Sequence, residues 1–396
     1  MKLVEQHTIK KSDSRFKELD NICFLSKNLY NAGLYAVRQH FFESEKFLNY
    51  SELAGEFVKE KNVDYYALPT KVSQQTLKMV EQNFRSFFGL LKSKKKDEKV
   101  SIPKYLPKTD GRFPTYYTIQ AISKKKFNQG VVKLSGTNVE IETNKENIKQ
   151  ARIIHKGSHI NIEIVYEVED TKKLPNNERY CAIDLGVNNL AAVGSNVLKP
   201  IIINGKPLKS INQYYNRRLG KLKSKIELNH GRKTSKKIKS LTRKRNDKVK
   251  DYLHKTSRYI INHLVSSQIN TLVIGKNKGW KQEINIGKKN NQKFVQIPHA
   301  RYIEMLKYKA DIAGINVVIQ QESHTSKCSF LDNEPVKHQK KYLGRRVKRG
   351  LFKSATGRLI NADLNGALNI LKKAIGEFEY SIEVCSTPSV SNCEMF

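Results

Sequence analysis

The sequence predicts a multidomain protein of mixed α/β and α+β class, in which an N-terminal small β-barrel with an inserted helical domain precedes a C-terminal domain with a mixed β-sheet. Three patterns carry this prediction: apolar residues at helical spacing early in the chain, alternating apolar and polar residues near its middle, and a later strand, helix, strand succession. A chain of 396 residues is long enough for two or three domains with separate cores. Residues 170–178 are polar and turn-rich, so we place the domain boundary there.

The N-terminal half combines helices and strands. Apolar residues recur at helical spacing from Phe16 to Leu48 and from Val72 to Lys95, which predicts packed helices. From Ile160 to Val168 apolar and polar residues alternate, which is typical of a half-buried strand. We therefore expect residues 1–15 and 98–172 to form the small barrel or sheet, with residues 16–97 as the inserted helical domain.

The C-terminal half begins with three short apolar runs, Tyr180–Asp184, Leu190–Val193 and Pro200–Ile203, which Gly and Asn turns separate. This spacing predicts an antiparallel meander. Later, Thr271–Ile274 and Asn316–Ile319 predict strands joined by a helix over residues 300–313. Strands joined by such a crossover run parallel, so their carboxyl ends lie side by side. A last helix is expected over residues 362–374.

The chain is strongly basic. It contains 73 Lys and Arg residues against 37 Asp and Glu, a formal net charge of +36, and the resulting self-repulsion favours a polyanionic partner such as nucleic acid. We do not expect a membrane to be the partner of this charge, because no apolar run approaches the ~18 residues of a spanning helix. The first residues lack the apolar stretch of a signal peptide, and the five cysteines are scattered. We expect a cytoplasmic protein with reduced thiols.

Positive charge is concentrated in two segments. Between Lys206 and Arg258 there are 19 basic and 3 acidic residues, and apolar residues at helical spacing predict a basic helical hairpin within residues 206–270. Between Val336 and Arg358 there are nine basic residues and no acid, for which we expect a basic loop, partly disordered when unbound. A solvated face is the simpler interpretation of a charge run, but this excess favours phosphate contacts. The candidate nucleic-acid-binding residues are Arg217, Arg218, Lys236, Lys237, Arg243, Lys244, Arg245, Arg345, Arg346, Lys348 and Arg349.

Two aspartates stand where a cleft can form. Asp184 ends an apolar strand ahead of a Gly-Val-Asn-Asn turn, and Asp363 stands at the start of the last helix. Each alone has a simpler interpretation, because aspartate commonly caps the ends of helices and strands. As a pair they offer the oxygen ligands that Mg²⁺ or Mn²⁺ accepts. Two such ions about 3.5–4 Å apart would clamp the attacking and leaving oxygens of a phosphodiester.

Several segments closely resemble the TnpB (OrfB) family of insertion sequences, RNA-guided nucleases related to type V CRISPR effectors. The matching segments are Asp184–Leu190, Leu272–Gln282, Glu322–Lys327, Arg346–Phe352 and Asn361–Ile370. The resemblance implies a RuvC-type, RNase H-like nuclease domain over residues 176–322 and 360–378, with the N-terminal barrel as wedge and the helical domain as recognition region. Residues 323–359 would form a basic nucleic-acid-binding insertion and residues 379–396 a tail.

The same resemblance implies function. The protein would bind a guide RNA from the transposon end and cleave matching double-stranded DNA in the prokaryotic cytosol. Guide pairing would choose the sequence, and the basic residues would hold the phosphate backbone. No partner protein follows from the sequence. Two other functions stay open: a nuclease-dead RNA-guided DNA-binding protein or repressor, and an accessory role in DNA transposition.

The chain departs from the family at the fourth strand. Most members carry a glutamate there, whereas this sequence has Gly275. Glu322 follows the fifth strand, which the crossover puts about 4.8 Å away, so its carboxylate reaches the same cleft. We therefore expect Asp184, Glu322 and Asp363 to bind the metal, with Glu283 as the weaker substitute. A solvent-facing turn is the simpler interpretation of Glu322.

A second departure concerns zinc. Many relatives insert a four-cysteine zinc ribbon before the last aspartate, but only Cys328 remains here. His324 and His338 are the only nearby nitrogen ligands, which is too few for a tetrahedral site. We therefore expect no structural zinc.

Overall fold

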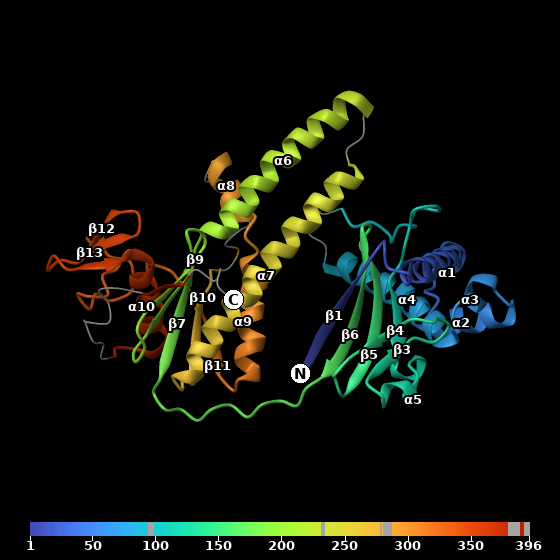
Figure 1. Ribbon diagram of the computed structural model, residues 1–396, viewed down its shortest axis with the longest axis horizontal. Helices are drawn as coiled ribbons and strands as arrows, with labels where there is room; N and C mark the ends of the chain where they lie inside the picture. Colours follow the sequence, from blue (N-terminus) through green and yellow to red (C-terminus); the bar gives the residue numbers. More distant parts are fainter. Residues whose placement is uncertain (94–98, 231–233, 278, 280–286, 379–388, 392–396) are drawn as a thin grey trace. The chain divides into compact units, whose positions relative to one another are not determined.

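The structure is a computed structural model that describes residues 1–93, 99–230, 234–277, 279, 287–378 and 389–391 (Figure 1). Glu283, the weaker substitute acid, lies outside these residues. The chain divides into two units, Met1–Glu169 and Asp170–Phe396. No described helix is both long and apolar enough to cross a bilayer.

The first unit combines a sheet with a group of helices. Its strands are β1 (Lys2–Lys10), β2 (Thr115–Thr118), β3 (Val131–Lys133), β4 (Glu140–Glu142), β5 (Ile148–His155) and β6 (His159–Glu167). Its helices are α1 (Phe16–Ser44), α2 (Tyr50–Lys59), α3 (Val63–Tyr66), α4 (Thr70–Ser93), the 3₁₀ turn η1 (Ile119–Ala121) and α5 (Lys124–Phe127).

The expected barrel is wrong for the described residues, because the strands form an open sheet. Four antiparallel strands pair in the order β1-β6-β5-β2, so β1 and β2 remain edges, while β3 and β4 pair apart from them. Closure requires the edge strands to pair. Here β2 is only four residues long, and helices cover one face of the sheet instead.

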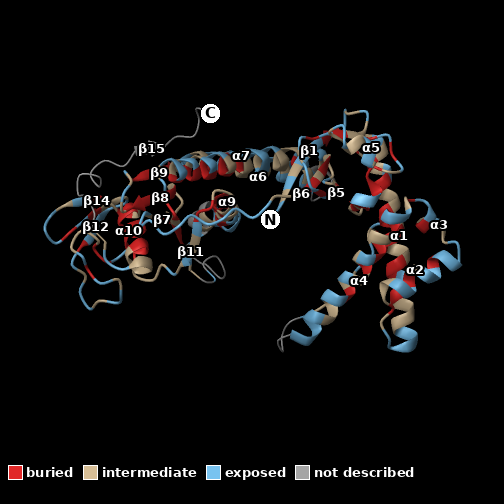
Figure 2. Ribbon diagram, turned by 90° about the horizontal axis from the view of Figure 1, so that it is seen from below, coloured by how far each residue is buried: buried red, intermediate tan, exposed pale blue. Residues whose placement is uncertain are grey.

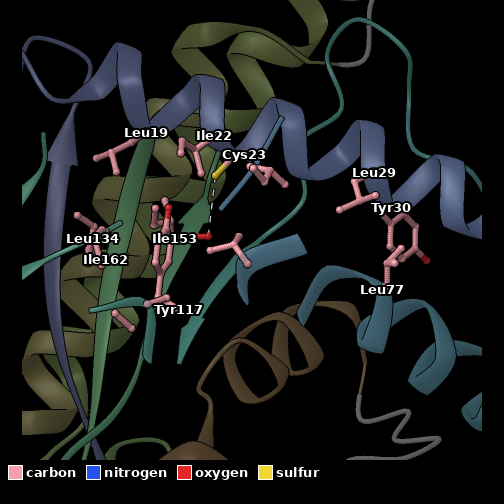
Figure 3. Packing of buried hydrophobic residues seen from close by; sticks show 14 of the residues in the cluster. Leu19, Ile22, Cys23, Leu29, Tyr30, Leu77, Tyr117, Leu134, Ile153 and Ile162 are labelled. Atoms are coloured by element: carbon pink, nitrogen blue, oxygen red, sulfur yellow. Dashed lines mark hydrogen bonds between the residues drawn. The ribbon is translucent and has the colours of Figure 1, made fainter. Parts of the chain in front are cut away.

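The core of this unit lies between the sheet and the helices α1 and α4. Leu19 and Cys23 of α1 pack with Ile153 and Ile162 of the strands, and the Cys23 Sγ–H donates to the Ile153 carbonyl at 3.9 Å (Figure 3). All four side chains are fully buried. Helix α4 leaves this core toward its end, where Leu90 is 57% exposed (Figure 2).

The second unit is built on a six-stranded mixed sheet in the order β11-β10-β7-β8-β9-β15. Its strands are β7 (Tyr180–Leu185), β8 (Asn189–Ser195), β9 (Ile201–Asn204), β10 (Thr271–Gly275), β11 (Asn316–Gln320) and β15 (Ser389–Ser391). The antiparallel meander β7-β8-β9 is confirmed. The parallel crossover from β10 to β11 is confirmed as well, and β7 is the parallel neighbour of β10 on its other side.

Helices cover both faces of this sheet. The helices are α6 (Lys206–His230), α7 (Lys236–Ser266), α8 (Lys288–Val295), α9 (His299–Ile312) and α10 (Ala362–Ile375). Ile183 and Ile274 face a core that α7 and α9 contribute to, whereas Ala182 and Val273 face α10. Because side chains alternate along a strand, Asp184 and Gly275 share the face that α10 covers. The candidate site therefore lies on the face of the sheet that α10 covers.

The predicted basic hairpin is formed by α6 and α7, which run side by side (Figure 1). The base of α7 is anchored by Leu253, Ile260 and Leu264, which are fully buried in the sheet core. Basic residues therefore gather on the part of the hairpin that extends beyond this core.

The expected basic loop over residues 336–358 is wrong in part, because strands occupy its second half. Strands β12 (Arg345–Lys348), β13 (Leu351–Lys353) and β14 (Leu359–Asn361) form a three-stranded antiparallel sheet. Phe352 is 1% exposed and packs with Ile360 and Leu364. This small core orders the segment and leaves the side chains of β12 exposed.

Candidate active site

Asp184 lies at the carboxyl end of β7, against the backbone of α10. A β-carbon added at Gly366 would come within 2.6 Å of Asp184 Oδ2, so the glycine makes room for the carboxylate. Burial raises the pKa of Asp184 well above its usual range, and the negative charges of Glu322 and Asp363 raise it further. Arg346 acts in the opposite direction. Three distant acids and one arginine thus share one electrostatic environment.

Gly275 leaves the space that the carboxylate of Glu322 occupies. A β-carbon built at Gly275 would lie 2.4 Å from Glu322 Oε1, 2.8 Å from its Cγ and 2.6 Å from Ile370 Cδ1. Contacts this short do not occur, so a side chain at position 275 and the observed side chain of Glu322 exclude each other. Glu322 follows β11 by two residues, and Gln320 of β11 pairs with Gly275. The space beside Gly275 of β10 is therefore filled by an acid that follows the neighbouring strand.

Asn277 holds Glu322 by two hydrogen bonds. Its Oδ1 accepts from the Glu322 backbone N–H at 3.1 Å, and its Nδ2 donates to Glu322 Oε2 at 3.4 Å. The other carboxylate oxygen, Oε1, is buried without a hydrogen-bond partner among the described residues. Burial raises the pKa of Glu322 to about 7. A buried acceptor without a partner, on a carboxyl group with a raised pKa, is typical of functional sites.

Asp363 stands in the first turn of α10 but does not cap it. Asn361 is the cap, because its Oδ1 accepts from the backbone N–H groups of Asp363 at 3.0 Å and Leu364 at 3.2 Å. The carboxylate of Asp363 instead accepts from Asn189 Nδ2 at 2.7 Å and from Arg346 Nη2 at 3.2 Å. The capping interpretation therefore does not apply to Asp363, and its carboxylate is held by side chains of β8 and β12.

The donor chemistry of these three acids suits a hard divalent cation. All candidate ligands are carboxylate oxygens, which Mg²⁺ prefers, and a cation would counter the burial and the repulsion that raise the pKa of Asp184. However, no group of three His, Cys, Asp or Glu side chains is close enough to hold a metal ion within the part of the chain that the structure describes. The charges of Glu322 and Asp363 therefore act on Asp184, but the three described side chains do not form a coordination cluster.

The predicted basic residues fall into two groups. Most are exposed: Arg217, Arg218, Lys236, Lys237 and Lys244 on the helical hairpin, and Arg345, Lys348 and Arg349 around β12. The others have partners within the chain. Arg243 pairs with Asp247 at 3.5 Å, Arg346 pairs with Asp363, and the half-buried Arg245 donates to Asn212 Oδ1 at 2.8 Å and to the Gln296 carbonyl at 2.9 Å. Arg245 therefore ties α7 to α6 and to the segment after α8.

Buried polar side chains hold the segment between Thr325 and Asp363. Glu334 is 2% exposed and accepts from the backbone N–H groups of Ser329 at 2.7 Å and Leu343 at 3.1 Å. Asn365 and Asn369 of α10 both donate to the Cys328 carbonyl, at 2.9 and 2.8 Å. Hydrogen bonds thus connect both ends of this segment to each other and to α10.

Sequence reasoning missed three residues that shape the site: Asn189, Asn277 and Gly366. Both asparagines lie in segments that carried the family resemblance, but their hydrogen bonds depend on which strands are neighbours. Gly366 stands three residues after Asp363, on the side of α10 that meets Asp184. A glycine inside a helix is unfavourable by about 1 kcal/mol relative to alanine, and that was the available signal for a close approach.

Comparisons with known proteins found matching family models and curated relatives. Residues 163–281 match the OrfB_IS605 family, described as probable transposase, and residues 299–370 match the Cas12f1-like TNB domain. A TnpB-like protein, ORF457 of Acidianus two-tailed virus, is 24% identical over 91% of this chain and 84% of its own length. The CRISPR-associated endodeoxyribonuclease Cas12f2 of a Micrarchaeota archaeon is 27% identical over 55% of this chain, and the match spans 41% of that protein.

Solved structures share the fold. The Cas12f1–sgRNA–target DNA complex matches with a TM-score of 0.54 and 15% identity, over 89% of this chain and 82% of that chain. The mini-RNA-guided endonuclease CRISPR-Cas_phi3 matches with a TM-score of 0.51 and 11% identity, over 96% of this chain and 94% of that one. The fold is thus a mixed α/β multidomain architecture resembling Cas12 effectors. The sequence matches make the chain similar to TnpB-like and Cas12f proteins, and the structure matches show that it shares their kind of fold.

Proposed function

We propose that this chain is a transposon-encoded RNA-guided DNA endonuclease with Asp184, Glu322 and Asp363 as its metal ligands. The observation that carries the proposal is the carboxylate of Glu322 in the space beside Gly275, on the sheet face that Asp184 shares. This arrangement supplies the third acid at the position where the family acid is absent. The TnpB-like and Cas12f2 relatives and the nucleic-acid-bound Cas12f1 structure support the same class of activity.

The three acids would hold Mg²⁺ or Mn²⁺, which supplies a Lewis acid and lowers the pKa of water for attack on a phosphodiester. The chain's own residues prepare this site. Asn277 orients Glu322, Asn189 orients Asp363, and Gly366 lets Asp184 approach α10. Because burial raises the pKa of Glu322 to about 7, its carboxyl group gains or loses a proton near neutral pH, and a bound cation would favour the ionised form.

The basic surfaces would hold the nucleic acids. The exposed cations of the α6–α7 hairpin and of β12 contact phosphates, which carry no sequence information by themselves. Pairing with a guide RNA from the transposon end would select the target DNA. The net charge of +36 requires a partner of opposite sign, and guide RNA with target double-stranded DNA supplies it.

Cleavage by a matched pair of variants tests this proposal. The protein is purified with its bound RNA, the RNA is sequenced, and cutting of a matching duplex is followed with and without Mg²⁺. Glu322→Gln removes a proposed ligand, whereas Glu304→Gln changes a side chain that is 67% exposed on α9. We expect Mg²⁺-dependent cutting by the parent and by Glu304→Gln and its loss in Glu322→Gln. Equal cutting by both variants would overturn the assignment of Glu322.

A nuclease-dead, RNA-guided DNA-binding protein is the second candidate function. The observation that favours it is the Arg346–Asp363 ion pair, because the guanidinium neutralises one proposed ligand and no three acids are drawn together in the described residues. The same experiment separates the two candidates. Guide-dependent binding of the duplex without cutting by the parent protein, at any Mg²⁺ or Mn²⁺ concentration, would establish the second.

A further inference from the structure

A hollow of about 780 Å³ opens between α6 and α7, separate from the three acids. Its walls carry Tyr214 and Arg218 from α6 and Lys237, Lys244 and Lys248 from α7. A volume of this size is in the range of pockets that enclose a ligand of several rings. No acidic side chain lines it, so its electrostatic character is wholly positive. We call it the hairpin groove.

The cations of the hairpin groove are not neutralised by the chain itself. Arg218, Lys237, Lys244 and Lys248 form no ion pair within the described ranges. The two aspartates of α7 pair elsewhere along the helix, Asp247 with Arg243 at 3.5 Å and Asp251 with Lys255 at 3.1 Å. With Arg245, five cations line the hollow, and they repel one another unless an anion with several charges lies between them.

Of the two tyrosines in the hairpin groove, Tyr215 is held by contacts with α7, whereas the ring of Tyr214 is exposed. The Tyr215 hydroxyl lies 3.1 Å from Thr242 Oγ1, which joins α6 to α7, and the Arg245 guanidinium lies 5.7 Å from the Tyr215 ring centre. Tyr214, the next residue on α6, is 53% exposed and has no hydrogen bond or ring contact in the described part of the chain. The groove therefore offers an unoccupied aromatic face beside its cations.

We propose that the hairpin groove binds a single-stranded segment of nucleic acid, with an unpaired base stacked on Tyr214 and its phosphates on Arg218, Lys237, Lys244 and Lys248. Cations alone fit any polyanion, but an open aromatic face beside them fits a base that is not paired. In a duplex the base faces are covered by their neighbours, so only a single strand presents one. Every base has such a face, and the groove is therefore expected to tolerate any sequence.

Binding without cleavage tests the hairpin groove independently of the acids. The full chain is stripped of nucleic acid at high salt, kept in EDTA, and titrated into fluorescent ten-residue oligo(dT) or oligo(U). Tyr214→Ala is expected to raise Kd between about fivefold and about 150-fold for at least one of the two strands, with the salt dependence unchanged. Tyr214→Phe retains a stacking ring and is expected to bind like the parent. Tyr35→Ala is the matched control, because Tyr35 is a 58% exposed tyrosine of α1 in the other unit.

Charge is tested in the same titrations. Lys244→Gln is expected to reduce the slope of log Kd against log salt by about 0.7, the value for one phosphate of a single strand. A preference for oligo(U) or oligo(dT) identifies RNA or DNA as the strand bound. The proposal is overturned if Tyr214→Ala binds both single strands like the parent, or if Tyr35→Ala weakens their binding as much as Tyr214→Ala does. It is also overturned if Tyr214→Ala weakens binding of a blunt duplex or of a polyglutamate peptide as much as it weakens binding of the single strands. Since no step requires cutting, a failure here leaves the nuclease proposal unaffected.

Discussion

The side chain of Glu322 lies over the α-carbon of Gly275, where a β-carbon would come within 2.4 Å of its Oε1. The two positions therefore cannot both carry side chains in this arrangement. With Glu322 and Ile370 in these positions, residue 275 has room for a glycine alone. The size of residue 275 and the position of the Glu322 side chain are therefore coupled.

A glutamate placed at position 275 is expected to damage the site. In Gly275→Glu the new side chain collides with Glu322 and Ile370, and overpacking of this kind typically costs 1–3 kcal/mol of unfolding free energy. Cutting should be lost as well, because two carboxylates then compete for one space. The double variant Gly275→Glu/Glu322→Ala should recover part of both. Thermal unfolding and cleavage rates measure the two effects.

A glycine without close neighbours gives the control for that series. A β-carbon at Gly55 of α2 meets nothing within 4 Å, so Gly55→Ala should be neutral or slightly stabilising. If Gly275→Glu were as stable and active as Gly55→Ala, the reciprocal relationship between positions 275 and 322 would be refuted.

Asn277 should act as a positioning residue for Glu322. Asn277→Ala removes both hydrogen bonds to Glu322, and loss of such a supporting partner typically lowers metal affinity or activity 10- to 100-fold. We expect a higher Mg²⁺ concentration at half-maximal cutting, with much of the rate recovered at saturating Mg²⁺. A purely structural role would instead lower the melting temperature and leave the Mg²⁺ dependence unchanged.

The raised pKa of Glu322 gives a pH dependence of stability in the absence of metal. The group binds a proton more tightly in the folded chain, with a pKa of about 7 against an ordinary value of 4.5. Its stabilising contribution is therefore complete below pH 4.5 and is lost as the pH rises to about 7. Glu322→Gln removes this loss, so in EDTA the variant should become more stable than the parent as the pH rises through this window.

Mg²⁺ should reverse that difference. Mg²⁺ bound by the ionised carboxylate stabilises the folded parent at pH 8. It binds the neutral glutamine of the variant more weakly and therefore stabilises the variant less. Melting curves of both proteins between pH 4.5 and 8, with EDTA or Mg²⁺, give the comparison. Asp184 contributes with the same sign, because burial raises its pKa too, so a pH dependence should remain in Glu322→Gln. Parallel curves for parent and variant at every pH would show that Glu322 is not the titrating group.

The sequence predicted the strand that carries Asp184 and the crossover that places Glu322 beside Gly275, because both depend on local patterns. An apolar run ends at Asp184, and a strand, helix, strand succession dictates parallel neighbours whose carboxyl ends meet. Whether β1 pairs with β2 depends on contacts between residues far apart in the sequence, which local patterns do not reveal. The sequence therefore predicted a barrel where the structure has an open sheet. The same limit applies to residues 336–358, where the burial of Phe352 against α10 turns an expected loop into strands.

Glu334 should be essential for the fold of the segment between Thr325 and Asp363. Its carboxylate is buried and accepts from two backbone N–H groups, Ser329 and Leu343, which close the segment as a metal would. Glu334→Ala leaves both donors unpaired, at a cost of about 1–3 kcal/mol each. We expect a lower melting temperature and faster proteolysis within the segment, measured by mass spectrometry of the fragments. A zinc chelator should leave the parent unchanged in the same assay, and fragmentation of the parent by the chelator would mean that a metal, rather than Glu334, holds this segment.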